Sequence, residues 1–410
     1  MNVAAFIAMR IAFNRQHSFS RFIIRLSVLA TILSVTVMIV TLAFANGFQN
    51  TISQKVFSFW GHIRIQNFET ARVAIAEETP ISKSDSVTNL IGKYPSIKNV
   101  QAFATKNAIL KTSESIEGVL FKGVEKNYDF SNLNNFLVRG RWIHFSDSGY
   151  SNEINISQYT AKELQIDIND KLLIYFIQPA GEPPRPRKLT VAGIYKTGIE
   201  EYDRLVALGD LALVQRLNNW EPDMVGGYEI FLKDFGQMDA ISEQIYPDIP
   251  IGLKSSTIRQ LYPSIFDWLA LQNQTITIVV IIMVTIASLN LITCLLILVL
   301  ERTRMIGILK AVGARNFTVQ QLFLFHGAII TLTGLLFGNA GGLLLCWLQE
   351  RFQFIKLPEQ AYYMSTAAVD IVWWQVAVIN IVTLVICLLV LLIPTILIKR
   401  IRPVRAIQFR

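Results

Sequence analysis

Four apolar stretches divide the chain, and each is long enough to cross a lipid bilayer. The hydrocarbon core of a bilayer is about 30 Å thick, and a helix of about 20 apolar residues spans it. We therefore predict transmembrane helices at residues 22–46, 273–300, 319–348 and 372–398. Arg25 lies near the start of the first stretch, where its side chain can reach the interface, and the other stretches carry no Asp, Glu, Lys or Arg except at their ends.

The first stretch also contains Ala43-Phe44-Ala45, which has the small-x-small pattern of a signal-peptidase site. A cleaved signal sequence has a shorter apolar region than this stretch. We therefore interpret residues 22–46 as a membrane span.

Basic residues gather before the first span, between the second and third spans, and after the fourth. Together with Arg25 at the start of the first span, these three segments hold thirteen Lys and Arg residues and one acidic residue. By the positive-inside rule the segments are cytoplasmic, so the sequence predicts an amphipathic cytoplasmic N-terminal segment at 1–21 and a cytoplasmic tail at 399–410. The formal net charge of +8 is then a signal of topology, and we do not interpret it as nucleic-acid binding.

With both termini inside, the long segment 47–272 and the short connection 349–371 lie outside the cytoplasm. Alternating runs in the long segment predict strands, as in 63–66, 171–177 and 188–195, and helical pieces lie between them. It contains no cysteine, so it must be stabilised by a packed core. We expect an α+β domain of two lobes, with one lobe at about 130–234 inserted into the other.

The fold class predicted is therefore a membrane α-helical protein of four transmembrane helices, with a large α+β extracytoplasmic domain between helices 1 and 2. The composition agrees, because 52% hydrophobic and 17% charged residues are too apolar for a soluble domain and too polar for a chain wholly inside lipid. The three cysteines lie within predicted spans, where they act as small hydrophobic residues.

Residues 178–187 contain four prolines, which favour a stiff protruding excursion over regular strand pairing. A tolerated surface loop and a partner-binding arm are both compatible with this composition.

The third predicted span carries Gly334, Gly338 and Gly342 at four-residue spacing, so its small surfaces share one helix face. These glycines can serve either close helix packing inside one subunit or a contact between two subunits. Asn290 and Asn339 are polar groups within spans, and we interpret them as partners in interhelical hydrogen bonds.

Between the second and third spans, residues 301–318 predict a short basic helix with one apolar face. A helix held between two spans can receive force from a soluble partner, so we interpret this segment as a coupling helix. The residues assigned to coupling are Arg302, Arg304, Met305, Ile306, Gly307, Ile308, Leu309, Lys310, Ala311 and Gly313.

Signatures of catalysis are missing from the sequence. The four histidines are scattered, and there is no HExxH, CxxC, GxSxG or GxxxxGK[ST] motif. We expect a non-catalytic membrane subunit without a catalytic residue, metal site or cofactor of its own, so any ATP hydrolysis belongs to another polypeptide.

Several motifs together carry a resemblance to a known family. They are Ala45-Asn46-Gly47-Phe48-Gln49, Gly193 to Gly198 followed by Glu201-Tyr202-Asp203, Ile306 to Ala314, Leu357-Pro358 with Tyr362-Tyr363, and Arg402-Pro403. In this order the chain resembles the transmembrane subunit of the lipoprotein-releasing ABC transporter, the LolC/LolE family. The segment 306–314 alone is shared with the wider FtsX-like and MacB-like permeases.

The resemblance implies the partners and the task. A cytoplasmic ABC ATPase dimer would bind the ATP and magnesium, and a second copy or a paralogue of the permease would complete the membrane part in the bacterial inner membrane. The complex would use mechanotransmission to extract lipoproteins from membrane lipid and hand them to a periplasmic carrier for sorting to the outer membrane.

The resemblance also implies roles along the coupling helix. Ile306, Leu309 and Val312 would dock in the ATPase, and Arg302, Arg304 and Lys310 would meet acidic or backbone acceptors. Many relatives have an acidic residue where this chain has Met305, so a salt bridge at this position is in doubt.

Two further sets of site residues follow from geometry and the resemblance together. The walls of a groove for lipoprotein acyl chains are assigned to Val40, Phe44, Phe48, Phe266, Leu269 and Ile276. Ordinary lipid-facing side chains are the alternative. The proline-rich excursion stands where some family members grip the carrier, so the carrier-binding loop is assigned to Pro179, Pro183, Pro184 and Arg185.

Two other functions are kept open. One is a MacB-like or FtsX-like permease for efflux or for control of cell-wall hydrolases. The other is a passive membrane-anchored scaffold, which would tolerate bulky replacements of Gly307 or Gly313 because it transmits no force.

Overall fold

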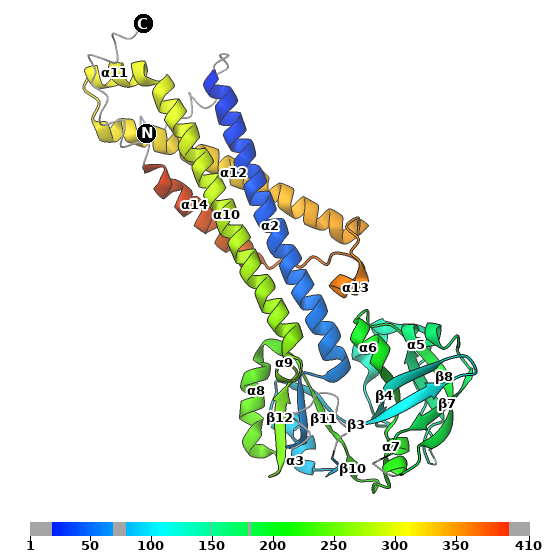
Figure 1. Ribbon diagram of the computed structural model, residues 1–410. Coiled ribbons are helices and arrows are strands. Elements are labelled where there is room, and N and C mark those ends of the chain that lie inside the picture. The colour runs from blue at the N-terminus through cyan, green and yellow to red at the C-terminus, as the bar shows by residue number, and fades with distance from the viewer. Residues whose placement is uncertain (1–18, 69–78, 148, 179–181, 393–410) are drawn as a thin grey trace. The chain divides into compact units, whose positions relative to one another are not determined.

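The computed structural model describes residues 19–68, 79–147, 149–178 and 182–392, so the predicted segment 1–21 lies mostly outside the described residues and the tail 399–410 lies wholly outside them. The chain forms two compact units (Figure 1). The helical unit comprises Met1–Asn50, Leu269–Lys356 and Thr366–Arg410, and the α/β unit comprises Thr51–Trp268 with Leu357–Ser365.

Four helices among the described residues are long and apolar enough to cross a membrane, which confirms the predicted number. They are α2 (Phe19–Trp60), α10 (Pro263–Glu301), α12 (Asn316–Phe352) and α14 (Trp373–Val390). The helices α2 and α10 continue well beyond the predicted spans, and both run uninterrupted from the helical unit into the α/β unit.

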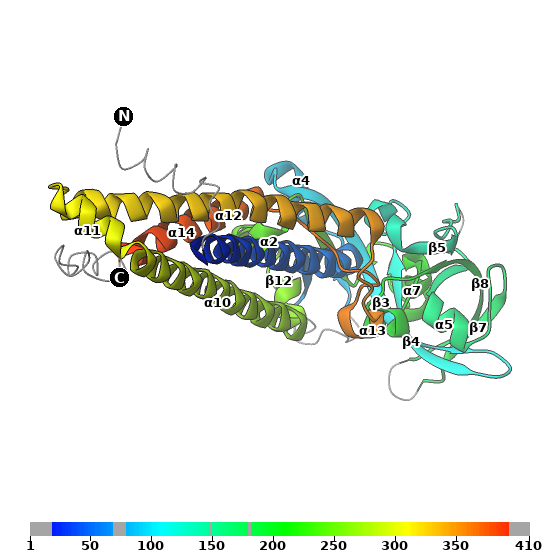
Figure 2. The ribbon, with the colours of Figure 1, turned by 90° about the horizontal axis from the view of Figure 1, so that it is seen from above.

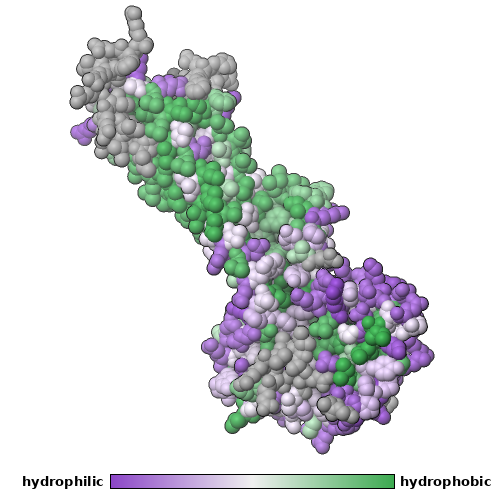
Figure 3. Space-filling model, viewed as in Figure 1, coloured by the Kyte–Doolittle hydropathy of each residue, from purple (hydrophilic) through white to green (hydrophobic). Residues whose placement is uncertain are grey.

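The helices of the helical unit bury one side against each other and expose the other. Figure 2 shows the long helices α2, α10, α12 and α14 from above. Buried apolar side chains of α10, α12 and α14 form a common cluster that includes Leu295, Phe323 and Cys387. Large apolar side chains remain on the outside, such as Leu33 at 63% and Ile278 at 57% exposure. The surface over these helices is accordingly mostly hydrophobic (Figure 3), as a lipid-facing surface must be.

Three asparagines within these helices form side-chain hydrogen bonds to a neighbouring helix. The amide of Asn290 donates to the carbonyl and hydroxyl oxygens of Ser27 in α2, at 3.1 and 3.0 Å. Asn339 of α12 and Asn380 of α14 exchange side-chain hydrogen bonds of 2.7 and 2.8 Å. These are interhelical bonds of the predicted kind, and they stabilise the packing because lipid offers the amides no other partner.

The α/β unit is built on a ten-stranded, mostly antiparallel sheet whose order is β12-β1-β11-β3-β4-β9-β6-β8-β5, with β7 paired to β3 and β8. Its strands are β1 (Ile63–Asn67), β3 (Ile97–Lys111), β4 (Ile116–Val124), β5 (Leu137–Gly140), β6 (Glu153–Ser157), β7 (Lys171–Phe176), β8 (Arg185–Tyr195), β9 (Val206–Asp210), β11 (Gly227–Leu232) and β12 (Leu253–Thr257). A separate pair joins β2 (Ile81–Ser82) to β10 (Met224–Val225).

Short helices accompany the sheet. They are α3 (Asp85–Thr88), α4 (Leu90–Lys93), α5 (Gln158–Glu163), α6 (Glu200–Leu205), α7 (Leu211–Asn218), α8 (Met238–Ile245), α9 (Ile258–Leu261) and α13 (Glu359–Tyr362). The sheet and the helices α3 to α9 form an α+β domain between the first and second long helices, as predicted, and α13 lies in the connection between α12 and α14.

The strands of the predicted inserted lobe are part of the same continuous sheet. Strands β5 to β9 fall within 130–234 and lie at one end of it. Strand β11 comes from the same range but pairs with β1 and β3. The division into two lobes stays a prediction.

The proline-rich excursion is shorter than predicted. Strands β7 and β8 form a hairpin in which Phe176 pairs with Arg185 and Tyr175 pairs with Pro186. The expectation that the prolines preclude pairing throughout 178–187 is therefore wrong for its last residues. Pro186 is tolerated because β8 pairs with β6 only from Thr190 onward, so the missing N–H of Pro186 interrupts no second ladder.

The two long helices join the sheet at neighbouring strands. Gly61, with φ of 70°, ends α2 through its N–H bond to the carbonyl of Phe57, and β1 begins two residues later. At the other end, β12 runs into α9 through a capping box of Thr257 and Gln260, and α10 follows. Because Ile63 pairs with Thr257, the two connections meet on one antiparallel ladder.

Candidate functional site

The predicted coupling segment is a tight helical turn between two long helices. Helix α10 ends at Glu301, α11 spans Thr303–Ala311, and α12 begins at Asn316. Gly313 ends α11 with φ of 97°, a left-handed conformation that favours glycine. The predicted segment 301–318 therefore includes α11 and the first residues of α12.

One side of α11 is buried against the helical unit. Ile306 is fully buried in the cluster that contains Leu298, Val319 and Phe323, and Met305 and Leu309 pack against the same cluster. Ile306, Leu309 and Val312 are expected to dock on a partner, and this expectation is wrong for Ile306. Ile306 has no exposed surface to offer, because it forms part of the chain's own core.

The outward side of α11 is apolar and cationic. Ile308 is 50% exposed and Val312 is 83% exposed, and Arg304 and Ala311 are exposed beside them. The positions 304, 308, 311 and 312 share one helix face. Lys310 is half-buried, and the loss of solvent lowers the pKa of its ammonium group. Val312 and Arg304, which were expected to contact the partner, thus lie on the exposed face, and Ile308 takes the place of Ile306 there.

The glycines of α12 form a ridge, defined here as Gly334, Gly338 and Gly342, that packs on α2 of the same chain. A Cβ at Gly334 would lie 2.5 Å from Thr31 Cγ2, one at Gly338 would lie 2.7 Å from Val35 Cβ, and one at Gly342 would lie 3.0 Å from Ile39 Cβ. The hydroxyl of Thr36 donates to the carbonyl of Gly338 at 3.0 Å. Of the two alternatives for these glycines, the structure supports packing within one chain.

The motif Ala45-Asn46-Gly47-Phe48-Gln49 forms a joint between α2 and the segment before α14. Gly47 has no room for a side chain, since a Cβ there would lie 2.4 Å from the carbonyl oxygen of Ala368. The amide of Asn46 bonds to Gln375 at 2.7 Å, and the backbone N–H of Asp370 donates to the carbonyl of Ala43 at 2.9 Å. The joint explains why this short polar motif interrupts an apolar helix.

The six residues assigned to the acyl-chain groove are not the most exposed apolar residues of their helices. Leu269 is 3% exposed, and the ring of Phe266 stacks on Phe57 with centroids 5.9 Å apart. Val40, Phe44, Phe48 and Ile276 are half-buried. Other apolar residues of α10 are more exposed, such as Leu271 at 60% and Ile282 at 47%, and they were not assigned to the groove. A helix that is apolar on every side gives no periodic signal to distinguish them.

The motif Glu201-Tyr202-Asp203 organises a turn of the α/β unit. The carboxylate of Asp203 accepts hydrogen bonds from the N–H groups of Thr197 and Gly198, at 2.9 and 3.0 Å, and from the Thr197 hydroxyl at 2.8 Å. Burial raises the pKa of Asp203, and these donors oppose the rise. The motif therefore has a structural role here.

This turn also holds the short connection between α12 and α14. Lys196 forms an ion pair with Glu359, and the ammonium group of Lys55 donates to the carbonyl of Tyr363 at 2.6 Å. The rings of Tyr363 and Trp268 pack edge to face, with centroids 6.1 Å apart. Residues 357–365 are thereby fastened to the α/β unit.

Of the residues assigned to the carrier-binding loop, Pro179 lies outside the described residues, and Pro183 and Pro184 are exposed. Arg185 is bound within the chain instead, because its guanidinium donates to the carbonyl of Leu217 at 2.7 Å. The exposed part of the loop is thus its proline part.

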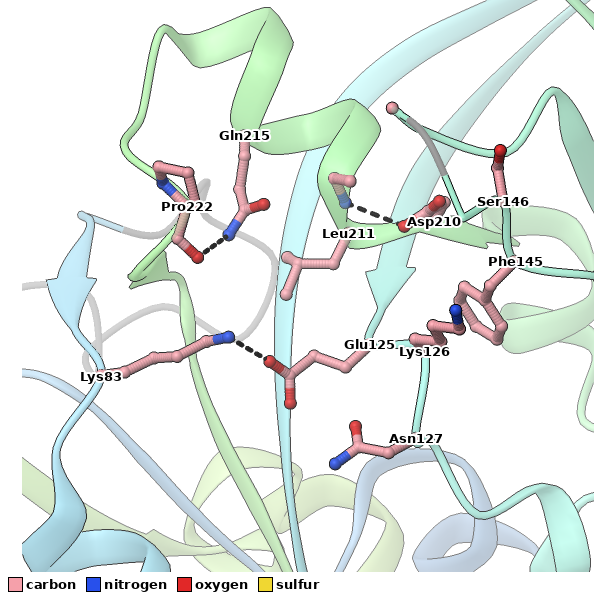
Figure 4. A pocket seen from close by; sticks show the side chains of 12 residues that line it. Lys83, Glu125, Lys126, Asn127, Phe145, Ser146, Asp210, Leu211, Gln215 and Pro222 are labelled. Carbon is pink, nitrogen blue, oxygen red and sulfur yellow. Dashed lines mark hydrogen bonds and ion pairs between the residues drawn. The ribbon is translucent and has the colours of Figure 1, made fainter.

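A polar hollow of about 430 Å³ lies between the end of β4 and the start of α7 (Figure 4). Lys83 and Glu125 form an ion pair of 2.5 Å across it, Asp210 caps α7 through the N–H of Ala212, and Gln215 donates to the carbonyl of Pro222. Because these polar groups are bound to one another, the hollow presents neither an activated nucleophile nor an acid–base pair.

Comparison with known families agrees with this architecture. Residues 26–246 match the family model of the MacB-like periplasmic core domain, and residues 277–403 match that of the FtsX-like permease C-terminal region. The chain therefore belongs to the FtsX-like permeases with a MacB-like periplasmic core domain. It is a multi-pass, non-catalytic membrane subunit whose α/β unit is periplasmic.

The curated relatives are similar over nearly their whole length. The chain is 24% identical to the lipoprotein-releasing system transmembrane protein LolC of Xylella fastidiosa, covering 96% of both chains. It is 22% identical to the LolE protein of that system in Haemophilus influenzae, covering 100% of both. The crystal structure of the periplasmic region of MacB from Actinobacillus actinomycetemcomitans gives a TM-score of 0.34 at 13% identity, covering 50% of this chain and 91% of that chain.

Permeases of this class belong to ABC transporters, so a partner ATPase is implied. The described residues contain no group of three or more His, Cys, Asp or Glu that could hold a metal ion.

Proposed function

We propose that this chain is the permease subunit of an ATP-driven transporter that extracts lipoproteins from the inner membrane and passes them to a periplasmic carrier. The observation that carries the proposal is the outward face of α11, where Ile308 and Val312 are exposed beside Arg304 on a turn between two membrane helices. The full-length similarity to LolC and LolE proteins supports the choice of lipoprotein as the substrate.

The exposed apolar face of α11 is suited to bind a soluble ATPase. A polar cytoplasmic turn has no reason to expose two large apolar side chains unless a partner covers them. Arg304 adds a cation that acidic or carbonyl groups of the partner can neutralise. Movement of the ATPase would then act on α10 and α12, which leave the turn in both directions.

The connection to the periplasm follows from the continuity of the helices. Helix α10 reaches the α/β unit through α9 and β12, and α2 reaches it through Gly61 and β1. Because β1 and β12 are paired, a change in the spacing of the two helices must strain or tilt one ladder. Movement of the membrane helices can thus pass directly to the strands of the periplasmic unit.

The energetics of the substrate explain why a covered route is needed. Each methylene group of an acyl chain contributes about 0.8 kcal/mol to membrane binding, so full hydration of three acyl chains costs on the order of tens of kcal/mol. We propose that the chains move along α2 and α10 beside Val40, Phe44 and Phe48. The half-buried state of these three side chains suits a wall that separates lipid from the helix interior.

The proposed arrangement has both termini in the cytoplasm and uses two permeases, either two copies or this chain and a paralogue. The charge distribution along the sequence supports this topology. Since the glycine ridge is occupied by α2, the second permease would contact other surfaces.

Variants of the α11 face test the coupling role. We expect Val312→Asp and Ile308→Asp to reduce co-purification of the co-expressed ATPase at least tenfold, because each places a charge in an apolar contact. Folding should be preserved, since both side chains are exposed. Ile251→Asp, at a fully exposed position of the α/β unit, is the matched control and should leave assembly unchanged. Normal ATPase binding by both α11 variants would refute the docking face.

The proline loop is proposed to bind the carrier. Replacing residues 179–184 by a short glycine-serine linker should abolish pull-down of the soluble carrier, because the exposed prolines and their stiff backbone are lost. ATPase assembly should be unaffected. A carrier that still binds the variant would reject this assignment.

The whole function is tested by reconstitution. Proteoliposomes with the permeases and the ATPase should release a labelled lipoprotein to the soluble carrier when ATP is supplied, and should retain it without ATP. Retention of the lipoprotein under both conditions would argue against the proposal.

Efflux or control of cell-wall hydrolases is the second candidate, because the periplasmic region matches the MacB-like core domain. ATP-dependent export of a soluble substrate from the same vesicles, without lipoprotein release, would favour it. A passive scaffold would show neither activity and would tolerate bulky residues at Gly307 and Gly313.

A further inference from the structure

The end of α2 in the α/β unit lies on a buried cluster of charges that the proposed function does not use. We call this cluster the α2 seat and define it as Phe59, Trp60, Arg64, Lys122 and Glu229. The side chains of Lys122 and Glu229 are 0% exposed, and that of Arg64 is 3% exposed. Phe59 and Trp60 are the last two residues of α2, and they are 1% and 2% exposed.

The charged members of the α2 seat share one face of the sheet. Arg64 of β1 lies directly opposite Glu229 of β11, and Lys122 comes from β4. The ammonium group of Lys122 lies 2.7 and 2.8 Å from the two carboxylate oxygens of Glu229. Residues from three strands therefore meet under the last turn of one helix.

Lys122 binds the helix itself as well as Glu229. Its ammonium group donates to the backbone carbonyl of Phe59 at 2.6 Å. This carbonyl belongs to the C-terminal end of α2, where the helix dipole is negative and carbonyl groups lack helical partners. The guanidinium of Arg64 lies 4.1 Å from the ring centroid of Trp60, so the second cation also holds the end of the helix.

The α2 seat holds two cations and one carboxylate. The excess positive charge is balanced by the negative end of α2 and by aromatic ring faces, since Lys122 lies 4.8 Å from the Trp60 centroid and 5.5 Å from that of Phe59. The two cations therefore interact with the carbonyl end and the aromatic rings of α2 as well as with Glu229. If α2 rotated on its axis, Lys122 would lose its carbonyl acceptor and Arg64 would lose its ring.

A purely apolar seat would lack this restriction. Apolar contacts are non-directional, so they restrict the rotation of a helix end less than hydrogen bonds and ion pairs do. A buried ion pair with hydrogen bonds has one favourable geometry, and its best-attested use is to specify register. The connection to β1 reinforces the effect, because a Cβ at Gly61 would lie 3.2 Å from the Glu229 Cβ.

We infer that Arg64, Lys122 and Glu229 are positioning residues that fix the rotation of α2 on the periplasmic sheet, so that movement of the helix is transmitted to β1. The inference rests on the proposed mechanical function. It goes beyond it by naming the groups that make the joint between α2 and the sheet rigid.

The test replaces the ion pair by apolar side chains of similar size. The double variant Lys122→Met with Glu229→Met should fold with unchanged or higher thermal stability, because buried ion pairs are often replaced by hydrophobic residues without loss. Either single variant leaves one buried charge unpaired and should express poorly. The matched control is Lys126→Met with Asp147→Met, an ion pair whose side chains are 66% and 95% exposed.

Two measurements are made on the complete transporter. The first is the distance distribution between spin labels at Ser58 of α2 and Asn132, which line one hollow of the α/β unit. It should be narrow in the wild type and the control and clearly broader in the buried double variant. The second is lipoprotein released per ATP hydrolysed, which should fall at least fivefold in the buried double variant only.

The outcomes separate the two levels of the proposal. An unchanged distance distribution in the folded double variant overturns the inference, and so does a broader distribution with unchanged release per ATP. If the wild type releases no lipoprotein, the proposed function fails, and the spin-label distances still decide whether the α2 seat fixes the helix.

Discussion

His62 follows the glycine that ends α2, and its ring is enclosed by aromatic side chains. The centroids of Phe57 and Phe231 lie 4.6 and 6.2 Å from that of the imidazole. Its Nδ1 accepts the backbone N–H of Leu232 at 3.0 Å, which requires the neutral form of the ring at this nitrogen. Burial lowers the pKa of His62 from 6.5 to about 4, and Lys98 adds to the effect.

The lowered pKa of His62 predicts a loss of stability in mild acid. The unfolded chain takes up a proton near pH 6.5 and the folded chain only near pH 4, so the stabilisation is complete above pH 6.5 and is lost as the pH falls toward 4. The drop in the pKa of His62 corresponds to a loss of at most about 3 kcal/mol in the free energy of unfolding.

Urea unfolding of the detergent-solubilised protein at pH 7.5 and 4.5 measures this loss. The variant His62→Asn keeps an acceptor near the position of Nδ1 but does not titrate. The difference between its unfolding free energies at pH 7.5 and 4.5 should therefore be about 2 kcal/mol smaller than in the wild type. An equal pH dependence in the wild type and the variant would show that His62 is not the group responsible.

At the scale of the element, the glycine ridge of α12 shows how a helix in lipid is held by shape. Gly334, Gly338 and Gly342 recur at four-residue spacing and meet Thr31, Val35 and Ile39, which have the same spacing on α2. Lipid is as apolar as the side chains, so close van der Waals contact takes the place of the hydrophobic effect.

A single methyl group on the ridge is therefore expected to be costly. Gly338→Ala should destabilise the protein by about 1–3 kcal/mol, because its Cβ would overlap Val35 and approach the Ile32 carbonyl. Gly341→Ala is the matched control on the same helix, since its Cβ meets only the Thr36 side chain, at 3.1 Å or more. Thermal unfolding in detergent compares them, and an equal loss in both variants would contradict a role specific to the ridge.

The sequence predicts the helices and their local motifs better than it predicts the outward face of α11 and the contacts between distant strands. The long helices, the α11 turn and the glycine ridge follow from local patterns, and they were predicted. The side of α11 that faces outward could not be derived, because Ile306, Ile308, Leu309 and Val312 offer two apolar faces and only tertiary packing selects one. The pairing of Lys122 with Glu229 spans 107 residues, and such long-range contacts leave no local signal.

At the scale of the whole molecule, exposed aromatic and basic residues mark where the helices leave the lipid. Trp347, Trp373 and Trp374 are 55%, 67% and 66% exposed at the ends of α12 and α14 that are joined by the short connection through α13. Arg351 and Lys356 are exposed near them. Tryptophan prefers the headgroup level of a bilayer, and long basic side chains reach the lipid phosphates from there.

This arrangement predicts a pattern of fluorescence quenching. In vesicles of brominated lipid, a variant whose only tryptophan is Trp373 should be strongly quenched, because its ring lies at the lipid interface. A variant that keeps only Trp60, which is 2% exposed in the α/β unit, should be quenched little. Equal quenching of the two would contradict the assigned depth of α14.

The pairing of Ile63 with Thr257 has a consequence for how this protein can vary. The first and last strands of the sheet are neighbours, so the chain between α2 and α10 enters and leaves the sheet at a single place. Such an insert behaves as a cassette, and a short hairpin could close the gap if everything between these two residues were removed. The size and the surface of the cassette can then change among proteins that keep the same four long helices.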